Sequence, residues 1–241
     1  MKHKMKKKEV SIIVGGSKGL GRAIYLDFKK KNKKVLVISR SKKNLKDHVF
    51  LDLNDKELFE KIINSKIKKN FKIKNLIFCQ RYRGDDVIGH FEVGLFSATR
   101  LINALKNQFI SSSSIIFINS IASKFIGSEQ GLGYHLSKAA LENLVKYYSV
   151  KFGKKNVRFN SISPGVIIKP ESKEFFKKSK KYKIMAREII PLKRLCKTDD
   201  VVNLCNFLCS DESSYITGQN IFLDGGLSVL DQETVARKSI R

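Results

Sequence analysis

Short apolar runs rich in β-branched residues alternate with longer amphipathic stretches along almost the whole chain of 241 residues. The runs that read as strands are residues 10–14, 35–39, 75–79, 115–119, 157–162 and 220–223. The stretches that read as helices are residues 20–30, 54–68, 92–109, 134–152 and 199–209. Strands separated by helices of ten or more residues predict βαβ units with right-handed crossovers. We therefore expect an α/β fold with a doubly wound parallel sheet and helices on both faces.

The chain shows no change in composition that would mark a domain boundary, and we expect residues 1–241 to form a single domain. Apolar residues make up 42% of the sequence, which is enough for a substantial core. Residues 1–8 read as a basic N-terminal tail, and residues 231–241 as a polar C-terminal tail. Residues 170–190 are polar and rich in lysine, and we expect them to form a lid over the substrate site.

The charge of the chain is strongly positive, with 48 Lys and Arg against 22 Asp and Glu and a formal net charge of +26. The basic runs are scattered rather than gathered into one stripe with interleaved aromatic residues, so we expect no nucleic-acid partner. The excess of basic residues has two interpretations. Lysines occupy solvated faces of the protein, or the positive charge attracts anionic substrates, acidic partners or membrane surfaces.

The four cysteines Cys79, Cys196, Cys205 and Cys209 lack the spacing of a metal site, so no metal is expected. Free thiols are the default in a reducing compartment, and we expect a cytoplasmic protein. No window approaches 18 apolar residues, so no membrane span is predicted.

A glycine-rich turn follows the first predicted strand and opens the first helix. Gly15, Gly19 and Gly21 frame it, with Ser17, Lys18 and Leu20 between them. Residues without a Cβ let the backbone approach a pyrophosphate, and the following helix offers free N–H groups and the positive end of its dipole. The position after a strand and before a helix makes this a predicted dinucleotide site.

The second predicted strand ends at Ser39, Arg40 and Ser41, where an acidic residue would bind the ribose hydroxyl of NAD. Arg40, together with Lys18, would instead neutralise a 2′-phosphate. We therefore expect NADP(H) to be favoured over NAD(H), the alternative being that Arg40 is an ordinary surface cation.

Tyr134 and Lys138 lie four residues apart in a predicted helix and therefore share one of its faces. A lysine one turn from a tyrosine stabilises a phenolate, which exchanges a proton with a substrate oxygen. Ser120 follows the strand that ends at residue 119, and its hydroxyl is placed to hold the same oxygen. These three residues are the predicted catalytic group.

At this point the chain resembles the short-chain dehydrogenase/reductase family from about residue 10 to residue 227. The motifs that carry the resemblance are Gly15-x-x-x-Gly19-x-Gly21, Ser120, Tyr134-x-x-x-Lys138, the segment 160–165 and the segments 216–219 and 223–226. The subfamilies that look most similar are 3-oxoacyl-acyl-carrier-protein reductases and sugar dehydrogenases. The resemblance implies a Rossmann-type fold that binds NAD(P).

The resemblance also implies roles for individual residues. It makes Tyr134 the general acid/base, Lys138 the residue on the nicotinamide ribose and Ser120 the residue that orients the substrate oxygen. It assigns further residues to the cofactor site, namely Asp52 and Leu53 near the adenine, Cys79 after the strand at 75–79, and Pro164, Gly165, Val166 and Ile167 near the nicotinamide.

Several positions depart from the family pattern. Val14 replaces a threonine, residues 78–81 (Phe-Cys-Gln-Arg) replace Asn-Asn-Ala-Gly, Gly94 stands where an asparagine helps to hold a relay water, and Lys169 replaces a threonine. These changes leave open a catalytically degenerate relative that binds cofactor or acts as a scaffold.

Arg81, Tyr82 and Arg83 follow the strand at 75–79 directly, at the edge of the sheet where ligands bind in open α/β folds. Two arginines and a tyrosine would clamp a carboxylate or phosphate. The expected activity is hydride transfer between nicotinamide and a carbonyl or secondary alcohol of a small substrate. The hypothesis for this substrate is an anionic one, such as a 3-oxoacyl thioester or an acidic or nucleotide-linked sugar. Alternatively, these residues cap the sheet or contact an acidic neighbouring subunit.

The family commonly forms tetramers through its long helices, and the resemblance therefore implies a homodimer or homotetramer. An apolar stripe in the helix at 134–152, formed by Ala139, Ala140, Leu144 and Tyr148, would suit helix pairing. Packing inside one subunit explains part of the same stripe.

Overall fold

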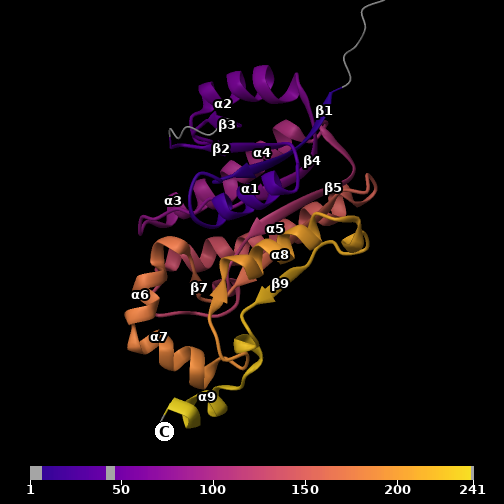
Figure 1. Ribbon diagram of the computed structural model, residues 1–241. Helices are drawn as coiled ribbons and strands as arrows, with labels where there is room; N and C mark the ends of the chain where they lie inside the picture. Colours follow the sequence, from indigo (N-terminus) through magenta and orange to yellow (C-terminus); the bar gives the residue numbers. More distant parts are fainter. Residues whose placement is uncertain (1–6, 42–46, 240–241) are drawn as a thin grey trace, which may run out of the picture.

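The computed structural model describes residues 7–41 and 47–239. Within them, seven parallel strands form one sheet in the order β3-β2-β1-β4-β5-β6-β9. The strands are β1 (Lys8–Val14), β2 (Val35–Ser39), β3 (His48–Phe50), β4 (Phe71–Phe78), β5 (Phe109–Ile118), β6 (Arg158–Pro164) and β9 (Asn220–Leu223). Figure 1 shows them running through the centre of one domain, which confirms the predicted fold class.

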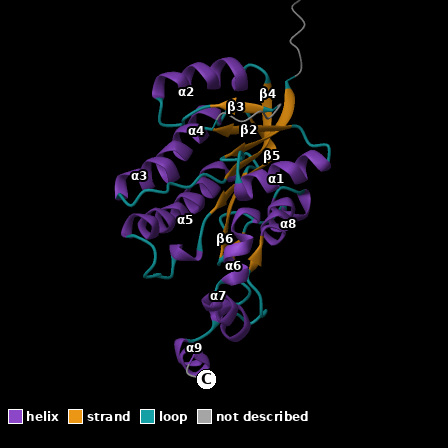
Figure 2. Cartoon of the chain, turned by 60° about the vertical axis from the view of Figure 1, so that its left-hand side comes forward, coloured by secondary structure: helices purple, strands orange, loops and turns teal. Residues whose placement is uncertain are grey.

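Helices cover both faces of this sheet (Figure 2). One face carries α1 (Gly19–Lys30) and α8 (Thr198–Leu208). The other carries α2 (Lys56–Ile62), α4 (Ser97–Leu105) and α5 (Leu132–Gly153). The segment η1 (Ile63–Lys68) continues α2, and α3 (Val87–Phe91) runs through η2 (Glu92–Phe96) into α4.

Alternate side chains of the central strands enter two separate cores, as expected for a sheet that is buried on both faces. In β1, Ile13 packs toward α1 and α8, whereas Ile12 and Val14 pack toward α2, α4 and α5. Phe28 of α1 and Phe159 of β6 are fully buried, one in each core. The two cores fix the strands in register and hold their carboxyl ends along one edge.

Several boundaries differ from the sequence predictions, and β4 and β5 begin four and six residues earlier than predicted. Strand β3 was not predicted, because three residues give too short an apolar signal. The predicted helix 92–109 begins at Val87 and ends at Leu105, since Phe109 belongs to β5 and packs its ring against Phe152 at 5.9 Å. Lys8 begins β1 rather than ending a tail, and residues 1–6 of that predicted tail lie outside the described residues. Most of the predicted C-terminal tail forms α9 (Gln232–Ser239), and residues 240–241 lie outside the described residues.

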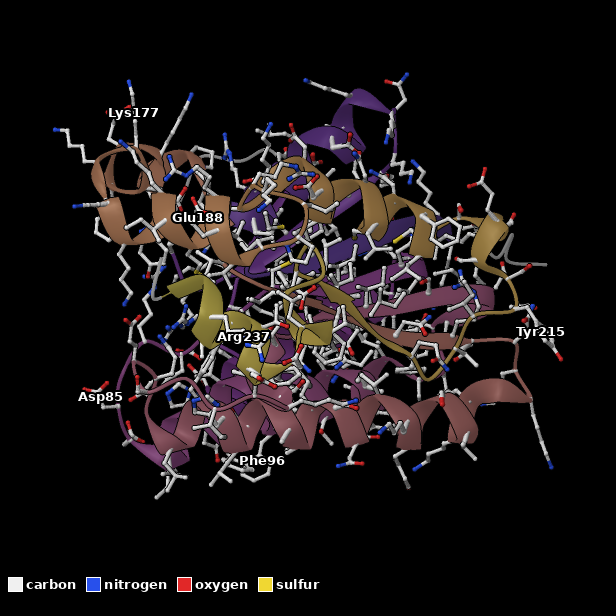
Figure 3. All side chains as sticks on the ribbon, turned by 90° about the horizontal axis from the view of Figure 1, so that it is seen from below. Asp85, Phe96, Lys177, Glu188, Tyr215 and Arg237 are labelled. Atoms are coloured by element: carbon white, nitrogen blue, oxygen red, sulfur yellow. The ribbon has the colours of Figure 1, made fainter. Side chains whose placement is uncertain are left out.

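The lysine-rich segment 170–190 lies between the two strands of a small parallel sheet, β7 (Ile167–Ile168) and β8 (Cys196–Lys197). It is helical and consists of η4 (Pro170–Ser172), α6 (Lys173–Lys178), α7 (Lys180–Ile184) and η5 (Met185–Ile189). Figures 1 and 2 place α6 and α7 at the end of the molecule opposite α2. The Lys177 side chain points outward into solvent (Figure 3).

The predicted helix-pairing stripe of α5 lies mainly inside the subunit. Tyr148 is buried against Phe152 and Phe159, and Leu144 packs against the same core. The exposed apolar side chains of α5 are instead Leu132, Leu136, Tyr147 and Val150. In the part of the chain that the structure describes, no helix is both long and apolar enough to cross a membrane.

Candidate active site

A cleft of about 520 Å³ opens at the carboxyl ends of β1, β2, β4 and β5. Open α/β sheets bind ligands at this edge. The cleft lies beside β1, where the chain stops adding strands on one side of β1 (β2 and β3) and begins to add them on the other (β4 onward). Most of the predicted cofactor residues line the cleft: Gly15, Ser17, Lys18, Gly19, Leu20, Gly21, Ser39, Arg40, Ser41, Asp52, Leu53, Cys79, Tyr134, Lys138 and Ile167.

The glycine turn has the geometry that its sequence predicts. Gly15 and Gly19 adopt φ angles of +78° and +52°, in the left-handed region that favours glycine. A Cβ on Gly21 would lie 2.5 Å from the carbonyl oxygen of Gly15, so α1 packs directly on the turn. Lys18, the N-cap of α1, makes no side-chain capping bond to the first N–H groups. The turn therefore presents a helix N-terminus to the cleft, which fits the pyrophosphate of a dinucleotide.

Polar and charged groups gather where β2 ends. The Ser17 and Ser41 hydroxyls lie 2.8 Å apart and join the glycine turn to the residues after β2. Arg40 extends into the cleft with 61% of its side chain exposed, and its Nη1 lies 3.9 Å from the Asp52 carboxylate. The guanidinium therefore stands at the position of the predicted ribose contact, although one acidic group partly offsets its charge.

Tyr134 and Lys138 enter the cleft from the first turns of α5. The Lys138 Nζ donates to the carbonyl oxygen of Ile118 at the end of β5, at 3.1 Å. That nitrogen lies 5.7 Å from the centre of the Tyr134 ring, and the Arg81 guanidinium carbon lies 4.8 Å from the same centre. Two cations therefore flank the phenol that the sequence predicts to be the acid/base.

Burial, together with the smaller effect of the nearby charge of Arg81, lowers the pKa of the Lys138 ammonium to about 8. Burial raises the pKa of the Cys79 thiol to about 12 in spite of the neighbouring Lys138. Lys138 therefore exchanges protons near neutral pH, whereas Cys79 stays a thiol and offers no nucleophile.

Some predicted site residues lie elsewhere. Ser120 is half-buried outside the cleft lining, and its hydroxyl accepts a bond from the Ala122 N–H at 3.2 Å. The Tyr82 hydroxyl bonds the Asp86 carboxylate, so Tyr82 does not join Arg81 and Arg83 in the cleft. Pro164, Gly165 and Val166 are also absent from the lining. Of the predicted anion clamp, only the two arginines face the cleft.

The structure adds residues that no local pattern had singled out for this site. Glu171 lies in the first turn of the predicted lid and contacts the glycine turn. Its Oε1 is 2.9 Å from the point where a Cβ on Gly19 would lie, and the Cδ of Lys169 lies 3.8 Å from the same point. His90 is buried with its ring 5.8 Å from that of Tyr134 and 5.2 Å from that of Tyr82. These contacts join segments far apart in the sequence, so neither spacing nor periodicity signals them.

Among the described residues, six basic and two acidic side chains line the cleft. The basic ones are Lys18, Arg40, Arg81, Arg83, Lys138 and Lys169, and the acidic ones are Asp52 and Glu171. Burial lowers the pKa of Lys169, and Arg81 lowers it further. The cleft therefore favours ligands that carry several negative charges.

The sequence matches a family model described as enoyl-(acyl carrier protein) reductase over residues 79–228. A glucose 1-dehydrogenase of Gluconobacter oxydans is 32% identical over 114 residues, covering 47% of this chain and 42% of that protein. A 3-oxoacyl-acyl-carrier-protein reductase of Thermotoga maritima is 29% identical over 184 residues, covering 72% of each. The chain spans about half the length of the first curated relatives that it matches.

A solved structure of 4-hydroxyisoleucine dehydrogenase complexed with NADH superposes with a TM-score of 0.80 at 26% identity, covering 93% of this chain and all of that one. The matched family model covers more than half of the chain, and the superposed structure shares its fold. The protein belongs to the short-chain dehydrogenase/reductase family, which confirms the resemblance seen in the sequence.

Proposed function

We propose that the protein is an NADP-dependent oxidoreductase that transfers a hydride between nicotinamide and a carbonyl or secondary alcohol of an anionic substrate. The observation that carries this proposal is the placement of Tyr134 and Lys138 in the same cleft as the glycine turn. The family relatives named as dehydrogenases and reductases support the reaction class.

The residues present fit a dinucleotide. The glycine turn leaves room for a pyrophosphate that side chains would fill, and the N-terminus of α1 supplies N–H donors. Arg40, Ser41 and Lys18 would hold a 2′-phosphate, with Asp52 and Leu53 beside the adenine. When bound, the dinucleotide supplies or accepts the hydride.

The chain's own residues move the proton. In the reductive direction the Tyr134 hydroxyl gives its proton to the substrate oxygen, and in the oxidative direction the phenolate takes it back. Lys138 and Arg81 lie close to the Tyr134 ring, so two cations stand beside the group that exchanges the proton. The bond from Lys138 to the Ile118 carbonyl fixes the ammonium beside the cleft. Ser120, released from Ala122, would hold the same oxygen.

Replacing Arg40 by Ala is expected to weaken NADPH binding by about 10- to 100-fold, because a charge-assisted contact to a phosphate is lost. NADH binding should change by less than about twofold, since NADH lacks that phosphate. Fluorescence titration of both dinucleotides measures the difference. Arg237→Ala in α9, which removes an exposed arginine paired with Glu233, is the control. Equal effects on NADPH and NADH would contradict the NADP preference.

Arg81 and Arg83 are the groups proposed to bind the anionic part of the substrate, such as a 3-oxoacyl thioester or an acidic or nucleotide-linked sugar. The double change to Gln is expected to raise KM for such substrates by about tenfold or more, because two charged donors are lost. Arg81→Gln alone should also move the alkaline limb of the pH profile to higher pH, because it removes a cation that lowers the pKa of Lys138. An unchanged KM for an anionic substrate with measurable turnover would exclude this role.

We also propose a homodimer or homotetramer in the cytoplasm. The exposed apolar residues Leu132, Leu136 and Val150 of α5 support self-association, and four unpaired cysteines support a reducing compartment. Multi-angle light scattering measures the oligomeric state, and a monomer at micromolar concentration would contradict that part.

A further inference from the structure

The loop at the proposed adenosine end of the cleft is bonded by a side chain that lies outside the cleft. This adenosine loop consists of residues 51–54, between β3 and α2, and all four residues line the cleft. Arg100 of α4 is not among the described residues that line the cleft. Its Nη2 donates to the Leu53 carbonyl oxygen at 3.1 Å and to the Asn54 Oδ1 at 2.8 Å. One guanidinium therefore holds both the backbone and a side chain of the same loop.

The other hydrogen bonds of the adenosine loop lie at its start or within its own turn. The Leu51 N–H donates to the Ser39 carbonyl oxygen of β2 at 3.1 Å. The Asp52 Oδ1 accepts from the Asn54 N–H at 3.0 Å, which shapes the turn but does not attach it to another element. Among the described residues, the bonds from Arg100 therefore tie the second half of the loop to a helix.

The stability of the fold alone does not account for the position of this arginine. The Nε of Arg100 is buried and has no hydrogen-bond partner among the described residues, and such an unpaired donor destabilises the folded state. The guanidinium also pairs with Glu92 of η2, whose Oε2 lies 3.4 Å from Nη1 and from Nη2. A partly exposed ion pair of this length stabilises little. Proteins tolerate such local costs mainly at functional sites. The loop that Arg100 holds therefore explains its position better than stability does.

The adenosine loop determines where Asp52 stands. The Asp52 carboxylate lies 3.9 Å from the Arg40 Nη1, and Asp52 and Leu53 are the residues proposed to lie beside the adenine. A loop that adopts its binding-competent shape only part of the time weakens binding by that fraction. Fixing the loop before the ligand arrives therefore strengthens binding, although Arg100 does not touch the ligand.

We propose that Arg100 is a positioning residue that preorganises the adenosine loop for the adenosine half of the dinucleotide. This inference rests on the proposed function, which places the adenosine beside this loop. Arg40 contacts the 2′-phosphate, so its loss affects only ligands that carry this phosphate. Arg100 acts on the loop beside the adenosine, which ligands with and without the 2′-phosphate share. The two arginines therefore differ in the set of ligands that each one affects.

Arg100→Met keeps a long side chain and removes both bonds to the loop. We expect the Kd values of 5′-AMP and of 2′,5′-ADP, which carries the additional 2′-phosphate, to rise by the same factor of about tenfold. Isothermal titration calorimetry measures both values without turnover. At saturating NADPH, kcat should change by less than about twofold, because Arg100 is remote from the reacting atoms, whereas KM for NADPH should rise. Arg100→Lys keeps a cation that donates to the same oxygens, so both Kd values should return to within about threefold of wild type.

Arg237→Met, at an exposed arginine paired with Glu233 on α9, is the matched control and should bind both nucleotides as wild type does. Asn54→Ala removes one of the two bonds from the side of the loop, and it keeps the role of Arg100 testable if Arg100→Met does not fold. We expect Asn54→Ala to weaken both nucleotides equally. In the double variant it should add less than its own effect, because the bond between the two residues is already lost.

The outcomes separate the role of Arg100 from the proposed function. Unchanged Kd values in Arg100→Met, a loss confined to 2′,5′-ADP, or fully additive effects in the double variant would overturn the role of Arg100 and leave the dinucleotide site intact. A wild-type protein that binds neither nucleotide would instead overturn the proposed dinucleotide site, and this inference with it.

Discussion

Tyr134→Phe is expected to lower kcat by about 10³-fold, because it removes the only atom of this side chain that exchanges a proton with the substrate. The ring remains, and with it the contacts to His90 and Arg81, so the fold and the shape of the cleft should persist. The affinity for NADPH should therefore change by less than about twofold. Steady-state oxidation of NADPH, together with a fluorescence titration of its binding, measures both quantities.

Tyr147→Phe provides the matched control for this change. Tyr147 lies on the same helix α5, and 59% of its surface is exposed. Its hydroxyl accepts a long hydrogen bond from Lys151 Nζ at 3.3 Å. It should retain wild-type turnover. If Tyr134→Phe retained turnover, the assignment of the acid/base would be wrong. If the wild-type protein bound NADPH but showed no turnover that depends on Tyr134, the protein would be better described as a catalytically degenerate relative that binds cofactor or acts as a scaffold.

Gly21→Ala should damage both stability and cofactor binding. The added methyl group would lie 2.5 Å from the Gly15 carbonyl oxygen and 2.9 Å from the Gly16 Cα, and both of these are backbone atoms that cannot rotate away. Overpacking of this kind costs about 1–3 kcal/mol, or a fall in Tm of about 2–12 °C for a chain of this size. NADPH affinity should fall at least about tenfold, because α1 is pushed away from the phosphate position.

Gly153→Ala separates this local clash from a general effect of losing glycine. Gly153 ends α5, and a Cβ there would meet no atom within 4 Å. Alanine should leave Tm unchanged or raise it slightly, since it favours the helix by about 0.5–1 kcal/mol. Thermal melts with and without NADPH measure both variants. A Gly21→Ala protein with wild-type Tm and affinity would show that the turn does not contact the dinucleotide.

Local patterns in the sequence were sufficient to predict most strands of the sheet and the residues on one side of the cleft. The glycine turn, the Arg40 position and the Tyr134-Lys138 pair depend on spacing within one strand or one helix turn, and such spacing is readable without a structure. Strand β3 escaped prediction because its three residues depend on pairing with β2 rather than on a periodic signal of their own.

The remaining part of the site depends on contacts between distant segments. Tyr82 was expected in the anion clamp, but its hydroxyl bonds Asp86, the N-cap of α3, and this turns the ring out of the cleft. Glu171 reaches Gly19 only because β7 and β8 bring the start of the predicted lid back over the sheet. Gln80 was visible only as a departure from the family pattern, and the small cavity that it lines cannot be seen in the sequence.

The six basic groups around the cleft also bear on the thermodynamics of the whole molecule. Gathering them in one place brings like charges together, which opposes the folded state in dilute buffer. A polyanion that enters the cleft relieves this repulsion, and at 100 times its Kd it adds about 2.7 kcal/mol to the free energy of unfolding. Dinucleotides, and even inorganic polyphosphate, should thus protect the chain from heat, and high ionic strength should reproduce part of that protection.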